Sequence, residues 1–172
     1  MTNPCARNLR DAQLFIIDGT GTPNVLQIPI MDGNLAWTFH NPTVTVLNRG
    51  KLYNRRTGND KEVDASFEFT FSQYAYASGG SGTPSVRDAL TQKGGASAWV
   101  STDISCDVYA TNLVFEIADP TNPTMSEQIV LPYFCVDSIA FKEGDPDKCT
   151  VTGKCFATDV TTTYGTKGRA PL

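Results

Sequence analysis

The sequence predicts a mainly β protein: a β-sandwich or partly closed barrel of about eight strands, with one short α-helix on its flank. Three observations support this prediction. Alternating apolar and polar residues, which are typical of half-buried strands, recur along most of the chain. Glycine, proline, aspartate and asparagine separate these segments at short intervals, as they do in turns. Only one stretch, at about 84–92, has helical spacing.

The longest strand signal is the Phe-rich segment Lys61–Ser72. Successive side chains of a strand point to opposite faces, so each parity of this segment defines one face. One face carries Val63, Ala65, Phe67, Phe69 and Phe71. The other carries Glu62, Asp64, Ser66, Glu68, Thr70 and Ser72. We therefore expect the three phenylalanines in the core, and the three carboxylates on a polar face directed toward something else.

Four shorter strands are expected before this segment. The apolar run at Ala12–Asp18 predicts a strand that is covered on both faces. The alternation at 25–30 predicts a second strand, which Pro29 confines to an edge or an end. After the turn signal at 32–33, residues 35–40 predict a third strand, with Trp37 in the core. The β-branched run at 43–47 predicts a fourth.

Asn48–Asp60 interrupts the pattern and predicts a loop longer than is usual in compact domains. This loop holds the most basic patch of the chain, and long loops of this kind often carry function. Its candidate contact residues are Arg49, Lys51, Tyr53, Arg55, Arg56 and Asp60.

The second half of the chain begins with the predicted helix. Thr83 is expected as its N-cap and Pro84 as its first residue, Leu90 lies on its buried stripe, and Gly94-Gly95 is expected to end it. Long strand regions follow at 104–117 and 127–141, and 149–160 predicts the closing strand. We expect one domain over 1–172, with its core at about 9–160 and extended arms at 1–8 and 161–172.

The composition and the distribution of apolar residues argue against several classes of function. The net charge is −4, so no overall positive field attracts nucleic acid. No apolar run has the length of a membrane span, and the N-terminal residues do not have the apolar core of a secretory signal. The five cysteines are an odd number and form no C-x-x-C pair. We expect them to be buried thiols of a protein that folds in a reducing cytoplasm.

No catalytic centre is expected. The single histidine, His40, lies at a predicted strand end and is expected to be a surface residue. Neither lysine that follows a glycine has the spacing of a phosphate-binding loop, and one histidine cannot form a His-rich metal site. The spacing of Glu62 and Asp64 is found on any polar strand face. We therefore expect no catalytic residue, no metal and no cofactor.

The order of features resembles the major tail tube protein of long-tailed bacteriophages. The resemblance is carried by the Phe-rich strand at 63–71, the helix at 83–90, the segment at 93–99 and the late strand at 151–155. They read VDASFEFTF, TPSVRDAL, KGGASAW and VTGKC. These pieces span most of 9–160, and the wider superfamily includes secretion-system tube proteins.

The resemblance implies a structural virion protein rather than an enzyme. It implies hexameric rings that stack into a tube, through which genomic DNA leaves the capsid without specific binding. The loop at 48–61 would contact the neighbouring ring, and Glu62, Asp64 and Glu68 would face the lumen or a subunit seam. Tape-measure, tail-terminator and baseplate or tail-tip proteins would be partners, and the protein would be made in the host cytoplasm without membrane contact.

Two other classes remain open from the residues. One is a carbohydrate-binding or adhesin-like sandwich, in which exposed Trp37, Tyr74, Tyr76 or Trp99 would form a platform for sugars. The other is a virion protein outside the tube, such as a head–tail joining or tail-terminator protein.

Overall fold

The structure, a computed structural model, is built around one large β-sheet, which confirms the mainly β prediction. It describes residues 12–28, 34–58, 62–70, 83–103, 105, 107–118, 126–144, 146–156 and 160–164. The strands are β1 Ala12–Ile17, β2 Val25–Ile28, β3 Ala36–Phe39, β4 Thr43–Asn48, β5 Lys51–Thr57, β6 Val63–Thr70, β7 Thr111–Ala118, β8 Ser126–Lys142, β9 Lys148–Cys155 and β10 Thr161–Tyr164. The helix α1 spans Val86–Thr91, and a 3-10 turn, η2, spans Gly94–Ala96.

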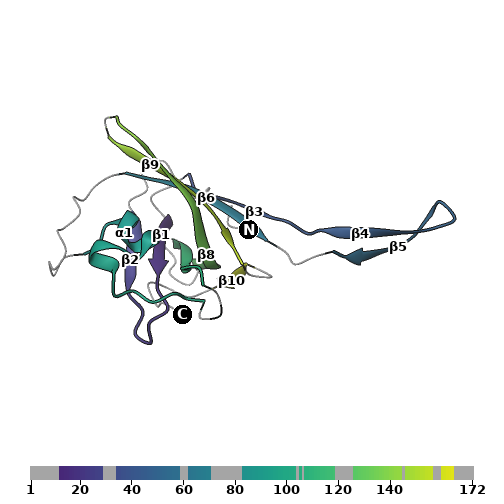
Figure 1. Cartoon of the computed structure of the whole chain (residues 1–172), viewed down its shortest axis with the longest axis horizontal. Helices are drawn as coiled ribbons and strands as arrows, with labels where there is room; N and C mark the ends of the chain where they lie inside the picture. Colours follow the sequence, from purple (N-terminus) through teal and green to yellow (C-terminus); the bar gives the residue numbers. More distant parts are fainter. Residues whose placement is uncertain are drawn as a thin grey trace, which may run out of the picture.

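Eight strands form the large sheet, in the order β2-β1-β7-β8-β9-β6-β3, with β10 pairing with β8. Strands β4 and β5 form a separate two-stranded sheet. All the pairings are antiparallel. Within these described strands the sheet folds over on itself but does not close into a barrel (Figure 1).

The long strand β8 divides the sheet into two halves. Its first part pairs with β7 and β10, and the part from Phe134 to Lys142 pairs with β9. Between the two parts Tyr133 has a φ of 53°, and the pairing with β9 shifts register between Val136 and Ser138. A left-handed residue and a bulge both bend a strand. We call β2, β1, β7, β10 and the start of β8 the first half-sheet, and the end of β8 with β9, β6 and β3 the second half-sheet.

The core lies between the two half-sheets. Leu14 and Ile16 of the first half-sheet belong to one buried cluster with Phe67, Phe69 and Val151 of the second. The rings of Trp37 on β3 and Phe115 on β7 have centroids 6.3 Å apart, although these strands are far apart in the sheet order. This contact shows that the bend of β8 brings β3, the last strand of the second half-sheet, toward β7 of the first.

Strand β6 has the two faces that its sequence predicts. Its burial alternates strictly, with Val63, Ala65, Phe67 and Phe69 buried and the residues between them half-buried. The ring of Phe67 lies 6.1 Å from that of Phe134 on β8. Phe71 lies outside the described residues.

Trp37 differs from its expected place in the core. It is 37% exposed, because β3 is the last strand of the second half-sheet and the core opens to solvent beside it. The tryptophan therefore lies at the rim of the core.

Helix α1 lies beside β2 and buries Val86, Ala89 and Leu90 (Figure 1). Its N-cap is Ser85 rather than Thr83, because Ser85 has extended backbone angles and its hydroxyl accepts a hydrogen bond from the Asp88 N–H at 3.1 Å. The helix ends at Thr91, with Gln92 left-handed at φ 53°. Gly94 and Gly95, which were expected to end the helix, begin η2 instead. No helix among the described residues is both long and apolar enough to cross a membrane.

Residues 48–57 of the segment predicted as a loop instead form the turn and the second strand of a β-hairpin. Strand β5 pairs with β4, and the two central residues of the turn, Arg49 and Gly50, have φ values of 49° and 79°. Two consecutive positive φ values define the turn type whose twist matches paired strands. The hairpin was not predicted, because Arg-Gly is a weaker turn signal than Asn-Gly. In addition, Leu52 and Tyr53 are adjacent in β5 and its other residues are polar, so β5 lacks the alternation typical of a strand. The C-terminal segment expected as an extended arm begins with β10, and residues 165–172 lie outside the described part.

Gly153 on β9 allows the close approach of β8 at its bulge. A Cβ at this position would lie 2.7 Å from the Phe134 ring and closer still to the carbonyl oxygen of Cys135. Gly153→Ala should therefore lower the free energy of unfolding by about 1–3 kcal/mol or more, through overpacking of rigid backbone. Gly21→Ala is the matched control, since a Cβ there meets nothing within 4 Å. Urea denaturation of both variants measures these free energies of unfolding. Equal values for the two variants would show that β8 and β9 move apart at little cost to make room for the Cβ.

Asp18 at the end of β1 fixes the following loop. Its carboxylate accepts hydrogen bonds from the Thr20 hydroxyl at 2.6 Å, from the Asn24 N–H at 2.7 Å and from the Val100 N–H at 3.3 Å. Burial alone would raise the pKa of Asp18, but these hydrogen bonds outweigh it and hold the pKa below its ordinary value of 3.8.

Because the folded pKa is depressed, the carboxylate stabilises the fold above the unfolded pKa, and this contribution is lost as pH falls through the folded value. Asp18→Asn should cost about 1.5–3 kcal/mol at neutral pH, since charge-assisted hydrogen bonds are lost. Urea denaturation from pH 7 to pH 3 should show the difference between variant and parent shrinking below about pH 4. A difference that stays constant with pH would rule out this role of the charge.

Candidate assembly surfaces

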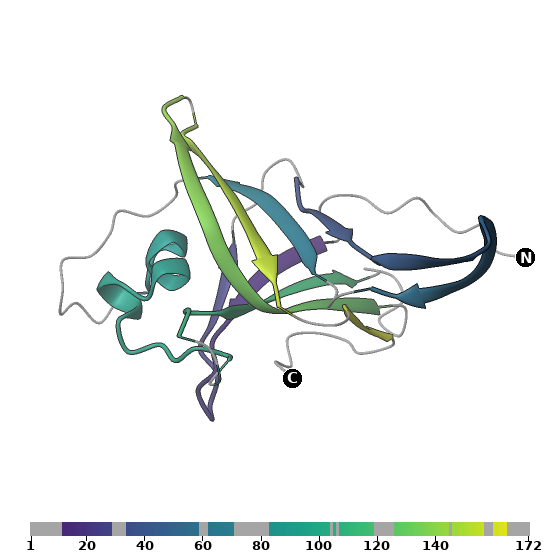
Figure 2. The same cartoon turned by 45° about the vertical axis from the view of Figure 1, so that its right-hand side comes forward.

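The β4–β5 hairpin, which we call the arm, stands out from the body of the molecule (Figures 1 and 2). It leaves the second half-sheet after His40 and returns at Gly58, whose N–H donates to the Pro42 carbonyl at 2.8 Å. Every residue of β5 is exposed, and on β4 only Val46 is half-buried. Among the described residues, the arm therefore contacts the rest of its own chain only near its base.

Large apolar side chains are exposed along the arm. Tyr53 is 74% exposed and Leu47 is 61% exposed, and the next most exposed are Leu52 at 59% and Val44 at 54%. The sequence predicts Tyr53 as a contact residue but not Val44, Leu47 or Leu52. The β-branched run at 43–47 predicts a strand. Only the pairing of this strand with β5 in a projecting hairpin shows that these side chains lie in solvent.

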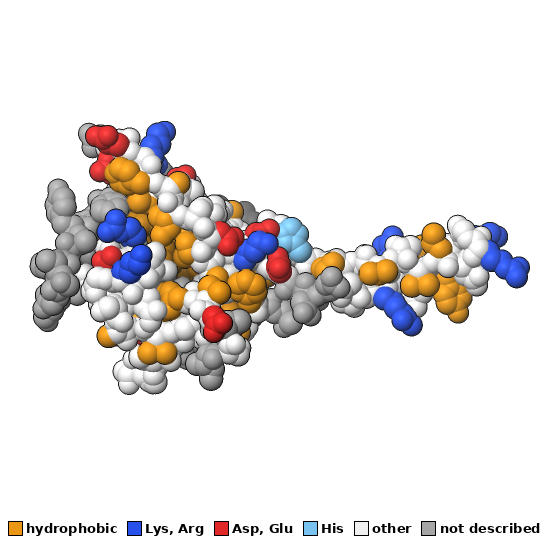
Figure 3. All heavy atoms as spheres, viewed as in Figure 1, with side chains coloured by type: hydrophobic (Ala, Val, Ile, Leu, Met, Phe, Trp, Pro, Cys, Tyr) orange, Lys and Arg blue, Asp and Glu red, His pale blue; other side chains and the backbone are white. Residues whose placement is uncertain are grey.

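The arm is also strongly basic. Arg49, Lys51, Arg55 and Arg56 all lie on it, and the residues from 43 to 58 include no aspartate or glutamate. Basic side chains are spread along the arm and at its tip in Figure 3. The structure thus brings together five of the six predicted contact residues, and Asp60 lies outside the described part.

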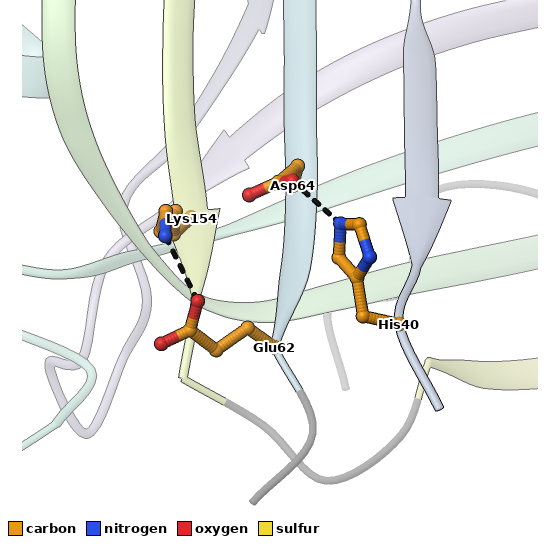
Figure 4. A network of polar contacts seen from close by, with 4 residues as sticks. All are labelled: His40, Glu62, Asp64 and Lys154. Carbon is orange, nitrogen blue, oxygen red and sulfur yellow. Dashed lines mark hydrogen bonds and ion pairs between the residues drawn. The ribbon is translucent and has the colours of Figure 1, made fainter. Parts of the chain in front are cut away.

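The second candidate surface is the outer face of the second half-sheet, where Glu62, Asp64 and Glu68 project away from the core. The Lys154 ammonium lies 2.8 Å from Glu62, and the His40 Nε2 lies 2.7 Å from Asp64 (Figure 4). Glu68 accepts hydrogen bonds from the Asn34 amide at 2.6 Å and from the Thr150 hydroxyl at 3.4 Å. Each carboxylate is thus held by a neighbouring strand or segment.

This outer face carries charges of both signs. The hydrogen bond and charge of Glu62, followed by the charges of Asp64 and Asp137, raise the pKa of Lys154, so it stays protonated. Register places Lys142 and Lys148 on the same face, so three lysines and one histidine lie among four carboxylates. Sequence analysis did not identify Lys154, Asn34 or Asp137 in this cluster, because only the pairing of β9 and β8 with β6 brings them there.

The described residues hold no group of three or more potential metal ligands. His40 lies at the end of β3, as expected for a strand-end residue, and its side chain is 53% exposed. Cys135, Cys149 and Cys155 are buried. Burial, followed by the nearby Cys135, raises the pKa of Cys155 to about 12, so this thiol is a poor nucleophile.

The structure describes two of the four aromatic residues proposed as a platform for sugars, and it buries one of them. Trp99 is only 6% exposed, and Trp37 packs against Phe115. Tyr74 and Tyr76 lie outside the described residues. The carbohydrate-binding alternative therefore loses Trp99, whereas Trp37 is 37% exposed.

No protein-family model matches the chain, and no curated protein matches it by sequence. Solved structures do share its fold. The chain is similar to one from the sheath–tube complex of the extracellular contractile injection system PVC in its extended state. The identity is 8%, the TM-score is 0.59 and the match covers 92% of both chains.

Two more similar structures come from the anti-feeding prophage. One is from its tube-terminating cap, with 7% identity, a TM-score of 0.58 and 95% of each chain covered. The other is from its baseplate, with 7% identity, a TM-score of 0.56, and 95% of this chain and 98% of that chain covered. At these identities the likeness establishes the fold, which spans nearly the whole chain.

Proposed function

We propose that this chain is a structural protein that assembles into hexameric rings, and that the rings stack into the tail tube of a bacteriophage or a related injection particle. The fold similarity to chains of injection particles supports this proposal over nearly the full length. Tape-measure, tail-terminator and baseplate or tail-tip proteins are its proposed partners, and the assembled virion is its proposed location.

The exposed arm is the observation that carries the proposal. An isolated two-stranded hairpin is marginally stable in water, and this one exposes Leu47, Leu52 and Tyr53. We infer that a second surface covers the arm and stabilises its shape. A second copy of the chain provides a suitable one: the arm carries four positive charges, so the rest of the chain carries a net charge of −8 against −4 for the whole.

The outer face of the second half-sheet fits a conduit for DNA. Glu62, Asp64 and Glu68 project from it, and we propose that they line the lumen or a subunit seam. These three carboxylates repel phosphates, so we expect DNA to pass without being held. In this account the arm holds copies together, and the carboxylates keep the channel free.

A single ring that caps a tube is the second candidate. The similarity to the tube-terminating cap is as extensive as that to the sheath–tube complex, with TM-scores of 0.58 and 0.59. The arm would then dock on a tube of another protein instead of on a further ring of the same chain.

Sedimentation velocity over a range of protein concentrations tests both candidates. A tube protein gives species that grow without a fixed limit as concentration rises, whereas a cap stops at one ring. Raising the salt concentration should weaken assembly in either case, because part of the contact is between opposite charges. A monomer that persists at the highest concentration, with a tail initiator present, would contradict both.

A further inference from the structure

We propose that the arm is a proteolytic switch, at which a protease that selects arginine or lysine inactivates a chain outside an assembly and leaves its body folded. Such a protease adds water across one peptide bond of the arm, and the bond becomes a new carboxylate and a new amine. The assembly part of this inference rests on the proposed function. The site itself follows from the sequence of the arm, its isolation from the core and the connectivity of the body.

The arm gathers the peptide bonds that such a protease recognises. Within eight residues, four bonds follow a basic side chain, at Arg49, Lys51, Arg55 and Arg56. All four side chains are exposed, and basic side chains on the arm stand clear of the body in Figure 3. The segment 43–58 holds no acidic residue that would repel a protease pocket selecting positive charge.

Opening the arm costs little, and cleavage depends on this cost. A protease needs several residues of unpaired backbone, so the rate of cutting follows the population of the locally opened form. Strand β5 has β4 as its described partner, and neither strand contributes a residue to a buried core cluster. A two-stranded hairpin is marginally stable in water, and here the pairing shifts register between Val46 and Leu47, close to the turn.

The other basic residues that the structure describes are held more firmly. Arg87 lies on α1, which is anchored by its buried face, and Lys154 lies on β9, which has β6 and β8 on its two sides. Lys93 is fixed by a hydrogen bond from its N–H to the Asp88 carbonyl at 3.1 Å and by another from the Ala96 N–H to its own carbonyl at 2.9 Å. Cleavage beside these residues requires an element of the body to open first.

Lys142 and Lys148 lie near the end of the β8–β9 pair, but acidic neighbours protect them. Glu143 follows Lys142, and Asp147 precedes Lys148. Negative side chains beside the cut bond oppose binding by a pocket that selects positive charge. Lys148 also pairs with Thr70 of β6, so β9 is held from both sides up to this point. The arm is therefore the preferred site among the described residues.

A cut in the arm divides the chain but not the fold. The N-terminal piece keeps β1, β2 and β3, and the C-terminal piece keeps β6 to β10 with α1. Strand β1 pairs with β7 along its whole length, and β3 pairs with β6. Leu14 and Ile16 of the first piece share a buried cluster with Phe67 and Leu113 of the second. The two pieces are therefore expected to stay associated as one folded body.

The same cut removes the arm as a docking element. The intact arm is anchored at both ends, where the Gly58 N–H donates to the Pro42 carbonyl. After cleavage each piece of the arm is anchored to the body at one end only, and a pair that is marginal when intact loses its structure. The exposed Leu47, Leu52 and Tyr53 are then no longer presented on one scaffold. In an assembly the arm lies on a second copy, so opening it also means breaking that contact, and the chain resists cleavage.

Trypsin, added to the dilute monomeric parent, tests the site. We expect one internal cut after a basic residue of 49–56, two large fragments in denaturing electrophoresis, and an unchanged elution volume and circular dichroism spectrum without denaturant. Mass spectrometry identifies the cut bond and separates it from trimming at the chain ends. In Arg49→Gln/Lys51→Gln/Arg55→Gln/Arg56→Gln the internal cut should slow by about tenfold or more, because the recognised side chains are gone. The matched control, Lys142→Gln/Lys148→Gln, should be cut in the arm at the parent's rate.

Sedimentation velocity separates failure of the switch from failure of the proposed function. The nicked body should not assemble, and the assembled parent should be cut in the arm at least about tenfold more slowly than free chains. Equal internal cutting of the fourfold variant and the parent, or a nicked chain that falls apart or assembles like the parent, would overturn the switch. Equal cutting of free and assembled chains would instead show that the arm is uncovered, which overturns the proposed contact between copies and leaves the site in the free chain standing.

Discussion

Replacing Phe69 with aspartate is expected to leave no folded protein. Phe69 is 4% exposed, and its ring lies 6.4 Å from that of Phe67 in the layer between the two half-sheets. Loss of the ring alone costs about 3–5 kcal/mol. Burying an unpaired carboxylate adds several kcal/mol, and the total reaches the whole stability of a typical domain of about 5–15 kcal/mol. Soluble expression and circular dichroism measure the result.

Glu68→Lys is the matched control for Phe69→Asp, because the two residues are adjacent but lie on opposite faces of β6. The two hydrogen bonds of Glu68 are exposed or half-buried. We therefore expect the variant to fold, with a change in the free energy of unfolding of at most about 1 kcal/mol. Assembly or DNA passage should be disturbed instead. An unfolded Glu68→Lys monomer would show that the two faces of β6 are wrongly assigned.

Removing the arm is expected to abolish assembly and to leave the body folded. The Gly58 N–H donates to the Pro42 carbonyl, so the two ends of the arm already meet, and a two-residue Asn-Gly turn can replace 43–57. The body should keep its thermal stability, because the arm contributes no residue to either buried core cluster. Circular dichroism and sedimentation velocity check both parts of this expectation.

A milder variant keeps the hairpin and reverses its charge. Arg55→Glu/Arg56→Glu changes the arm from four positive charges to a net charge of zero. It should raise the concentration needed for assembly and reduce the dependence of assembly on salt. If the armless chain assembled like its parent, the arm would have no part in the contact between copies. If instead the armless body unfolded, the arm would be part of the fold.

Local patterns carried most of the fold prediction. The strict alternation at 63–70 predicted both the strand and its buried face, because period-2 burial depends on neighbouring residues alone. The apolar run at 12–17 predicted β1, and Leu90 is 3% exposed as part of a buried helix stripe. The helix start was placed two residues early, since Thr83 and Ser85 are both good N-cap residues and only the tertiary structure selects between them.

Features that depend on distant residues could not be predicted in the same way. The bend of β8 depends on Tyr133 having a positive φ, which few non-glycine residues adopt, so the sequence gives little sign of it. The second strand of the arm, β5, was taken for a loop because its residues face solvent on both sides in the single chain. The partners of Glu62, Asp64 and Glu68 come from other strands, which can be identified only once the pairing is known.

The central claim is that this chain assembles with itself through the exposed arm into stacked rings. Electron microscopy of the concentrated parent chain, imaged beside the armless variant, tests it most directly. The account predicts hollow tubes with six-fold end views for the parent, and separate single particles for the armless chain. A parent chain that shows only separate monomers, even with a tail initiator present, would contradict it.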